Sequence, residues 1–310
     1  MHALWHTIRE SPLGFAIKLC DGTNWDESVL AMLREHFKVL SIMRRPLMRP
    51  LLRHYPMVTY RYFGTYIATS FTKKVRRDIL KAHYLYLADK VKEGFFSEVL
   101  RVKPTLWRAI IDGDKFAIAL SFTHKQHYEG DLLLEFQKNA VPLYHLSFTI
   151  VPGCYAGSAA REVIAIGRLQ GLRGQFDEIK AATKQCRDIA LSHLLVAATQ
   201  GIAAALEVKV LAGVRNSEQI TMNLEDMANF YFDYDAFWET LLGTRCDKFY
   251  LMPVPLPEKS LDRISTSHRR RARLRRLFKG EVAASTKRFF IENFLKSNSY
   301  IDQLSVVPPR

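Results

Sequence analysis

The spacing of the apolar residues changes once along the chain, near Phe116. Upstream of it, apolar residues recur at helical spacing, and Asn24 followed by Glu27 resembles the start of a helix. A second amphipathic helix is predicted over Arg76–Val91. From Phe116 onward apolar and small residues alternate, which is typical of a half-buried β-strand. We therefore expect a helical N-terminal region over residues 1–112 that packs on a sheet domain.

The second half of the sequence predicts a mixed sheet. Short gaps separate the strand-like segments that follow Phe116, so these strands should be antiparallel neighbours. A glycine-containing loop, a long apolar helix and another strand come next, and this order predicts a crossover between parallel strands. The predicted segments are the strands 131–138, 143–151, 162–169, 207–214 and 248–253 and the helices 177–206 and 234–242. The expected fold class is α+β, with a sheet domain over 113–257 and a basic helical segment over 258–310.

Composition and charge narrow the kinds of protein to consider. With 310 residues and 48% hydrophobic content, the chain can bury a large core. Its net charge of +14 favours anionic partners, namely lipid surfaces, phosphorylated cofactors, acidic carrier proteins or nucleic acid. Polar residues interrupt the longest apolar stretch, 189–206, which therefore reads as a buried helix rather than a membrane span. Widely separated cysteines and a first segment unlike a secretory leader predict a cytoplasmic protein with reduced thiols.

The motifs disfavour several classes of enzyme. The sequence contains no Gly-x-Ser-x-Gly elbow, no phosphate-binding lysine loop and no His-Glu-x-x-His helix. His124 and His127 form a close pair, but no cysteine or carboxylate follows at the spacing of metal ligands. We therefore expect no metal.

Several segments resemble the VirK/YbjX family over about residues 40–280. They are Ile166–Gly171, Phe232–Glu239, Ile264-Ser265, Arg77–Leu87 and Tyr144–Phe148. The family is defined by a domain of unknown function and is linked to virulence and to the envelope of Gram-negative bacteria, so the resemblance implies no catalytic residue. At the entry to the long helix, where relatives tend to have a Gly-x-Arg-Pro-Lys-like segment, this chain has Asp188–His193.

The order of the predicted elements also looks like that of the acetyltransferase (GNAT-like) superfamily. In that superfamily, backbone N–H groups after the fourth strand hold the pyrophosphate of acyl-coenzyme A. The segment Arg168–Gly174 loosely matches the corresponding motif, with Gly174 one residue late. Glycines allow a close backbone approach, and two arginines would add positive charge. The resemblance implies that acyl-coenzyme A or another carrier-bound acyl donor binds Arg168, Gln170, Gly171, Arg173 and Gly174. The alternative is that this segment is an ordinary turn.

The candidate acid or base groups are Glu162, His145 and Tyr250. Glu162 opens a predicted strand, and His145 lies on the opposite face of its strand from Tyr144. Glu162 and His145 could each border a pocket, but residues in such positions are more often ordinary surface residues. Nearby, the Asp233-Tyr234-Asp235 group suits helix capping better than catalysis.

A basic segment runs from His268 to Lys279. Its arginines are Arg269, Arg270, Arg271, Arg273, Arg275 and Arg276. The segment could be a solvated helix, a basic amphipathic helix that contacts an anionic membrane surface or an acyl carrier protein, or, less favoured, a nucleic-acid element.

Two functional hypotheses follow. The first is a cytoplasmic acyl- or aminoacyl-transferase-like protein that uses a phosphorylated acyl donor, with a role in envelope modification or virulence implied by the family resemblance. The second is a non-enzymatic binding protein that contacts anionic lipid, an acidic carrier protein or nucleic acid, with a peripheral position at the inner membrane. The sequence does not decide whether the protein is an enzyme.

Overall fold

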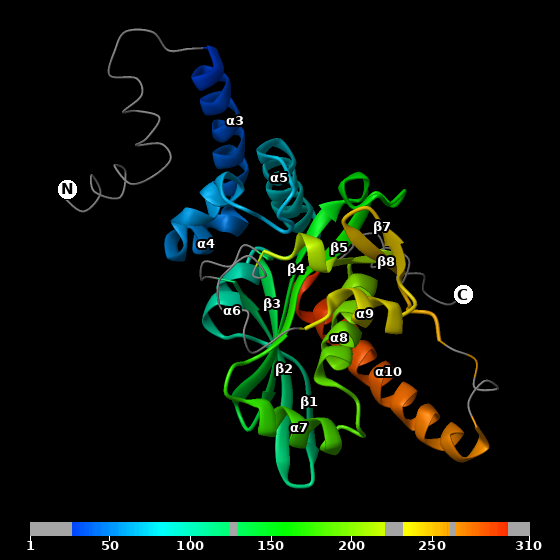
Figure 1. Cartoon of the computed structure of the whole chain (residues 1–310). Coiled ribbons are helices and arrows are strands. Elements are labelled where there is room, and N and C mark those ends of the chain that lie inside the picture. Colours follow the sequence, from blue (N-terminus) through cyan, green and yellow to red (C-terminus); the bar gives the residue numbers. More distant parts are fainter. Residues whose placement is uncertain (1–26, 124–128, 221–231, 259, 261–264, 297–310) are drawn as a thin grey trace, which may run out of the picture.

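The computed structural model describes residues 27–123, 129–220, 232–258, 260 and 265–296. In this part of the chain, eight strands form one sheet in the order β1-β2-β3-β4-β5-β6-β8-β7 (Figure 1). The pairing of β5 with β6 is parallel and every other pairing in the sheet is antiparallel. The strands are β1 Thr105–Ile111, β2 Asp114–Phe122, β3 Leu132–Lys138, β4 Val141–Pro152, β5 Glu162–Gly171, β6 Val210–Val214, β7 Thr244–Cys246 and β8 Phe249–Pro253. The predicted α+β class with a mostly antiparallel mixed sheet is confirmed.

Helices precede the sheet, connect its strands and follow it. They are α3 Glu27–Met43, α4 Arg49–His54, α5 Lys73–Lys90, α6 Phe95–Arg101, α7 Phe176–Gln185, α8 Leu191–Ala205, α9 Tyr234–Thr240 and α10 Thr266–Phe294. Short 3-10 helices lie at η1 Pro46–Met48, η2 Pro56–Phe63, η3 Gly153–Ala156 and η4 Asn216–Glu218. Prolines lie at the starts of η1, α4 and η2, where their fixed φ is favourable and a missing N–H costs nothing.

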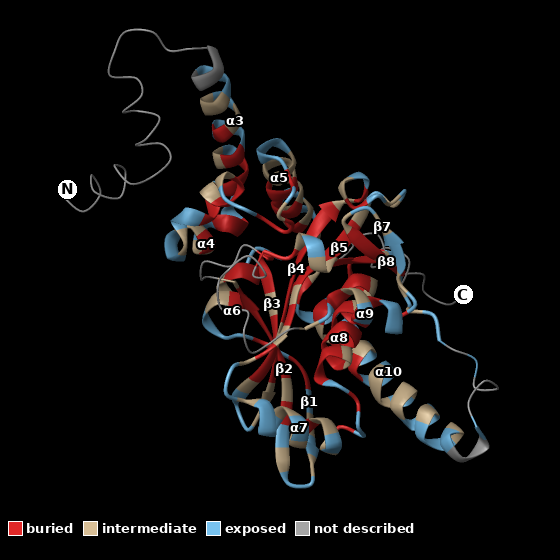
Figure 2. Cartoon of the chain, in the orientation of Figure 1, coloured by how far each residue is buried: buried red, intermediate tan, exposed pale blue. Residues whose placement is uncertain are grey.

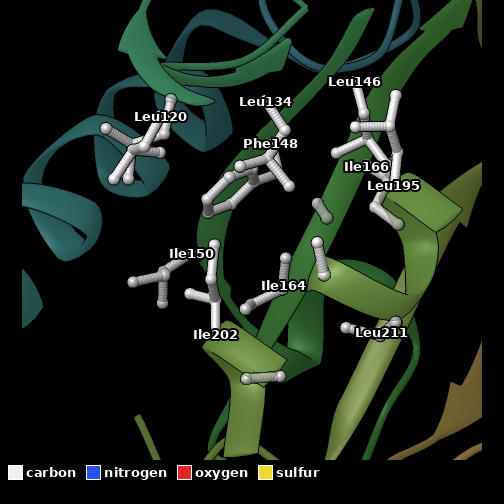
Figure 3. Packing of buried hydrophobic residues seen from close by; sticks show 14 of the residues in the cluster. Leu120, Leu134, Leu146, Phe148, Ile150, Ile164, Ile166, Leu195, Ile202 and Leu211 are labelled. Carbon is white, nitrogen blue, oxygen red and sulfur yellow. The ribbon is translucent and has the colours of Figure 1, made fainter. Parts of the chain in front are cut away.

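The core lies between the sheet and α8, with α10 outside α8. Nearly all of α8 is apolar and buried, as expected for a helix enclosed between two layers. Figure 3 shows Leu195 and Ile202 of α8 in one cluster with Leu134, Leu146 and Ile166 of the central strands. Burial is concentrated along these strands and α8 (Figure 2). The helix α8, which lies in the crossover between β5 and β6, therefore packs on the sheet to form the main hydrophobic core.

The N-terminal helices close an open edge of the sheet. β4 extends beyond the start of β3, and the N–H of Ile150 in this part of β4 donates to Nδ1 of His83 on α5, 3.1 Å away. α5 begins where Thr72 accepts a hydrogen bond from the N–H of Val75, a typical N-cap. The buried Tyr84 and Leu87 of α5 belong to the same core cluster as the sheet, so α5 packs on the sheet.

The structure corrects several predicted boundaries. Thr105–Ile111, which we expected within the helical region, forms β1, and Thr244–Cys246 adds β7. The predicted helix 177–206 is two helices, because Arg187 and Asp188 adopt positive φ between α7 and α8. The predicted helix start at Asn24 and the pair His124 and His127 lie outside the described residues.

Two features are absent from the described residues, a membrane-spanning helix and a cluster of metal ligands. No helix there has both the length and the apolar character needed to cross a membrane. In the same part of the chain, no three His, Cys, Asp or Glu residues gather as they would around a metal ion.

Candidate functional site

The predicted donor loop lies where β5 leaves the sheet. After Gly171 the chain turns and enters α7, and Gly174 in this turn has φ +78°, a conformation that favours glycine. Arg173 and Gly174 are exposed, and a Cβ at Gly174 would meet nothing within 4 Å. The loop has the backbone freedom that the motif required, but it lines neither of the two cavities described below.

Polar side chains gather on the sheet face opposite α8. The strand register aligns Glu135, His145 and Gln170 on β3, β4 and β5, and it aligns Ser147 with Arg168. These residues alternate with Leu134 and Leu146, which pack toward α8, so they share the other face. We call Ser121, Glu135, His145, Ser147 and Arg168 the polar sheet face. The structure thus brings together three residues that the sequence had singled out: His145, Arg168 and Gln170.

Hydrogen bonds and charges hold this face in place. Glu135 is 6% exposed and accepts hydrogen bonds from Ser121 (3.1 Å) and Lys103 (3.3 Å). Burial lowers the pKa of His145 to about 4, although the neighbouring Glu135 carboxylate opposes the shift. His145 is therefore neutral at pH 7.

A carboxylate from outside the strands lies against this face. Glu129 is buried, and its side chain is 3.7 Å from the guanidinium of Arg168. The backbone of Glu129 passes so close to β5 that a Cβ at Gly167 would lie 2.0 Å from the Glu129 carbonyl oxygen. Past this point β5 no longer pairs with β6, and the side chains of Tyr234 and Gln219 bond its edge at Leu169 N–H (3.1 Å) and Gly167 O (2.8 Å). The edge of β5 beyond its pairing with β6 is therefore bonded by side chains from other parts of the chain.

A second buried polar cluster lies beyond Glu129, where α5 meets β4. Asp131 is fully buried and pairs with Arg61 at 2.7 Å. Its carboxylate also accepts hydrogen bonds from the hydroxyl groups of Tyr66, Tyr84 and Thr149. Burial alone would raise the pKa of Asp131, but Arg61 and the tyrosine hydroxyls hold it below the usual value. Because each of these polar groups has an ion-pair or hydrogen-bond partner within the cluster, we assign the cluster a structural role.

One candidate ligand site is a cavity of about 460 Å³ beside α8, which we call the α8–α10 cavity. Ligand pockets usually measure about 300–1,000 Å³. Its wall is formed by α8, by the end of α9, by the segment after β8 and by α10. Leu241, Leu242, Pro255, Leu256, Ala272 and Ala283 give it an apolar part, and Arg275, Arg276, Lys279 and His193 give it a cationic and polar part.

Burial shifts the pKa values of two titratable groups in this cavity, Lys279 and His193. Burial lowers the pKa of Lys279, and Glu258 opposes that shift. Burial, with help from Lys279, lowers the pKa of His193 to about 4, so its ring is neutral at pH 7. Nδ1 of His193 is buried without a hydrogen-bond partner among the described residues. The cavity thus combines three cationic side chains, the carboxylate of Glu258, a neutral imidazole and apolar surface.

The remaining candidates lie apart from this cavity. Glu162 borders a second cavity of about 620 Å³, between the end of α5 and the start of β5, where its carboxylate is 3.0 Å from Arg161. The hydroxyl of Tyr250 donates to Glu239 at 3.1 Å. Asp233 caps α9 by accepting the N–H of Ala236, as the sequence indicated. Glu162, His145 and Tyr250 therefore do not form one catalytic group.

Five arginines in the first half of α10 divide into two sets. Arg271 pairs with Asp188, Arg275 lies 3.6 Å from the same carboxylate, and Arg276 pairs with Glu258 at 3.2 Å. Arg270 and Arg273 are exposed and make no ion pair with the described residues. The first set faces the body of the protein and the second faces outward.

The buried histidines allow a test of how burial lowers pKa values in this protein. His83, His145 and His193 each have a pKa lowered to about 4 by burial, against 6.5 when exposed. Between these values the unfolded chain binds more protons than the folded one, so the free energy of unfolding rises with pH. We expect the melting temperature to fall steadily as the pH is lowered from about 6.5 to about 4. Circular dichroism melts at stepped pH measure this.

A matched pair of variants sharpens that measurement. His193→Gln should reduce the dependence on pH, because it removes one of the three groups. His54→Gln should leave the dependence unchanged, because His54 is an exposed residue. A melting temperature that stays constant from pH 7 to 4.5 would show that these rings are not held neutral.

Comparisons with known proteins agree with the resemblance noted in the sequence. The family described as "Protein of unknown function (DUF535)" matches residues 28–287. The chain is also 28% identical over 241 residues to "Uncharacterized protein YbjX" of Escherichia coli (strain K12), an alignment that covers 74% of this chain and 71% of that protein. No solved structure matches the chain. Because the family match spans most of the sequence, the chain belongs to the DUF535 family, the VirK/YbjX family that its residues resembled.

Proposed function

We propose that this protein binds a phosphorylated acyl donor, such as acyl-coenzyme A or an acylated carrier protein, in the α8–α10 cavity. The observation that carries the proposal is the pairing of apolar wall and cationic side chains in one hollow. Apolar side chains favour an acyl or other hydrocarbon part, and Arg275, Arg276 and Lys279 favour phosphate. The arginine-glycine loop Arg168–Gly174 lines no such hollow, so we place the donor beside α10 instead.

The cationic side chains are suited to an anionic ligand by their surroundings. Arg275 and Arg276 are held in place by Asp188, by the carbonyl oxygen of Arg187 and by Glu258. Partial burial strengthens the interaction of a positive charge with phosphate, because solvent screens it less. Lys279 is partly buried and its pKa is lowered by that burial, so a negative partner would favour its charged form.

A thermal-shift experiment tests the donor site. Palmitoyl-coenzyme A should raise the melting temperature more than coenzyme A or palmitate alone, because it supplies both phosphate and hydrocarbon. Lys279→Gln with Arg276→Gln should remove most of this rise. The matched control, Lys287→Gln with Arg288→Gln, removes the same charge from exposed positions of the same helix and should keep it.

Two results would contradict the donor site. One is a wild-type protein that is not stabilised by palmitoyl-coenzyme A at any concentration tested. The other is an equal loss of stabilisation in the cavity variant and in the control variant, since general electrostatic attraction would then explain the binding.

Transfer of the acyl group is a second candidate function, and His193 favours it. The ring lines the cavity and is neutral at pH 7, so it could take a proton from an acceptor hydroxyl or amine. The new bond would join the acceptor to the acyl carbonyl carbon, the thioester C–S bond would break, and the proton would leave with the thiol. Free-thiol release with an added acceptor would measure this. His193→Gln should lower it by about 100-fold while palmitoyl-coenzyme A still binds.

A further inference from the structure

The first half of α10 projects from the body of the protein. The helix has 29 residues, and its later part is anchored by Val282, Thr286, Phe290 and Phe294, which are all buried. These anchors recur every four residues and so form one inner stripe. Figure 1 shows the first half of the helix extending away from the sheet, and Figure 2 shows it exposed or partly exposed.

The outward side of this half-helix combines arginine with leucine. Arg270, Arg273, Leu274 and Leu277 follow at helical spacing, and we call them the outer stripe. Leu274 is 38% exposed and Leu277 is 64% exposed. A helix that is simply solvated carries charged residues, but exposed leucines beside them do not stabilise it. Arg270 and Arg273 form no ion pair with the described residues, whereas the inward arginines do.

We propose that the outer stripe docks on an anionic lipid bilayer. Arginines attract the acidic headgroups, and leucines at the same level can enter the boundary between headgroups and acyl chains. Nucleic acid would use the arginines but would leave both leucines in water, because phosphate contacts reward charge alone. The stripe therefore fits a lipid surface better.

The α8–α10 cavity lies on the other side of the same half-helix. Ala272, Arg275 and Arg276 line the cavity, and at about 100° per residue they lie opposite the outer stripe. A bilayer on the outer stripe would therefore contact the side of α10 that faces away from the cavity. The docking surface does not depend on what the cavity holds.

Vesicle co-sedimentation tests the docking surface. The intact protein should sediment with vesicles of phosphatidylcholine mixed with phosphatidylglycerol and should stay in solution with phosphatidylcholine alone. Arg270→Glu with Arg273→Glu should weaken binding by about 25-fold or more, since each basic residue contributes roughly fivefold near an acidic leaflet. Leu274→Ser with Leu277→Ser should also weaken it, with no change of charge.

Matched controls separate this idea from its alternatives. Lys287→Glu with Arg288→Glu makes the same change of charge on exposed positions of the anchored half and should retain at least half of the binding. Gly280→Phe, which is designed to fill the cavity, should bind vesicles as the wild type does. The proposal is overturned if the wild type ignores the acidic vesicles, if the leucine variant binds them fully, or if the Lys287 and Arg288 variant loses as much as the Arg270 and Arg273 variant. It is also overturned if duplex DNA binds more tightly than the acidic vesicles.

Discussion

Replacing Asp131 by asparagine should lower the free energy of unfolding by about 3–5 kcal/mol. The substitution keeps the size of the side chain but leaves the guanidinium of Arg61 without its charged partner in a fully buried place. Tyr66 and Tyr84, whose hydroxyl groups donate to the same carboxylate, would lose a strong acceptor as well. Denaturant unfolding followed by circular dichroism measures the change.

Two comparisons identify the cause of that loss. Asp112→Asn removes the same charge from an exposed turn and should change the free energy of unfolding by less than about 0.5 kcal/mol. Adding Arg61→Met to Asp131→Asn removes the unpaired charge and should recover part of the stability. If Asp131→Asn is as mild as Asp112→Asn, the cluster does not hold α5 on β4.

Gly167→Ala should lower the free energy of unfolding by about 3 kcal/mol. The new Cβ would lie 2.0 Å from the carbonyl oxygen of Glu129, which is far inside van der Waals contact. Either β5 or the Glu129 backbone must move, and Glu129 would then leave its place beside Arg168. The same unfolding measurement reports this loss.

Gly280→Ala is the matched control for that prediction. A Cβ at Gly280 meets nothing within 4 Å, and the residue lies inside α10. Alanine is favoured over glycine within a helix, so this variant should gain about 1 kcal/mol. Equal effects of the two substitutions would mean that Glu129 does not lie against Gly167.

Alternation of apolar residues predicted the central sheet well, because β3, β4 and β5 each pack one face on α8. The pattern missed β1, whose Thr105–Ile111 carries Arg108 and exposed Ile110 on the outer face and so lacks a clear alternation. It also missed the break between α7 and α8, since Arg187 and Asp188 adopt positive φ without a glycine or proline to signal it.

The candidate site was predictable only where it follows local sequence. The loop motif identified Arg168 and Gln170, and the predicted strand identified His145. The structure brings them together because β4 and β5 are neighbouring strands. Glu129 gave one signal, the Glu129-Gly130-Asp131 turn, but its contact with Arg168 depends on how the chain crosses β5. The α8–α10 cavity could not be predicted, since His193, Leu241 and Lys279 come from elements far apart in sequence. The cationic side chains of the cavity nevertheless belong to the basic segment from His268 to Lys279, which is recognisable in the sequence.

The most direct test is calorimetric titration of palmitoyl-coenzyme A into the wild type, Gly280→Ala and Gly280→Phe. Gly280 lines the α8–α10 cavity and a Cβ there would meet nothing within 4 Å, so the phenylalanine variant is designed to occupy the hollow. We predict that the wild type and the alanine variant bind, and that the phenylalanine variant stays folded but does not bind. Equal binding by all three proteins, or no binding by the wild type, would contradict the assignment of this cavity as the ligand site.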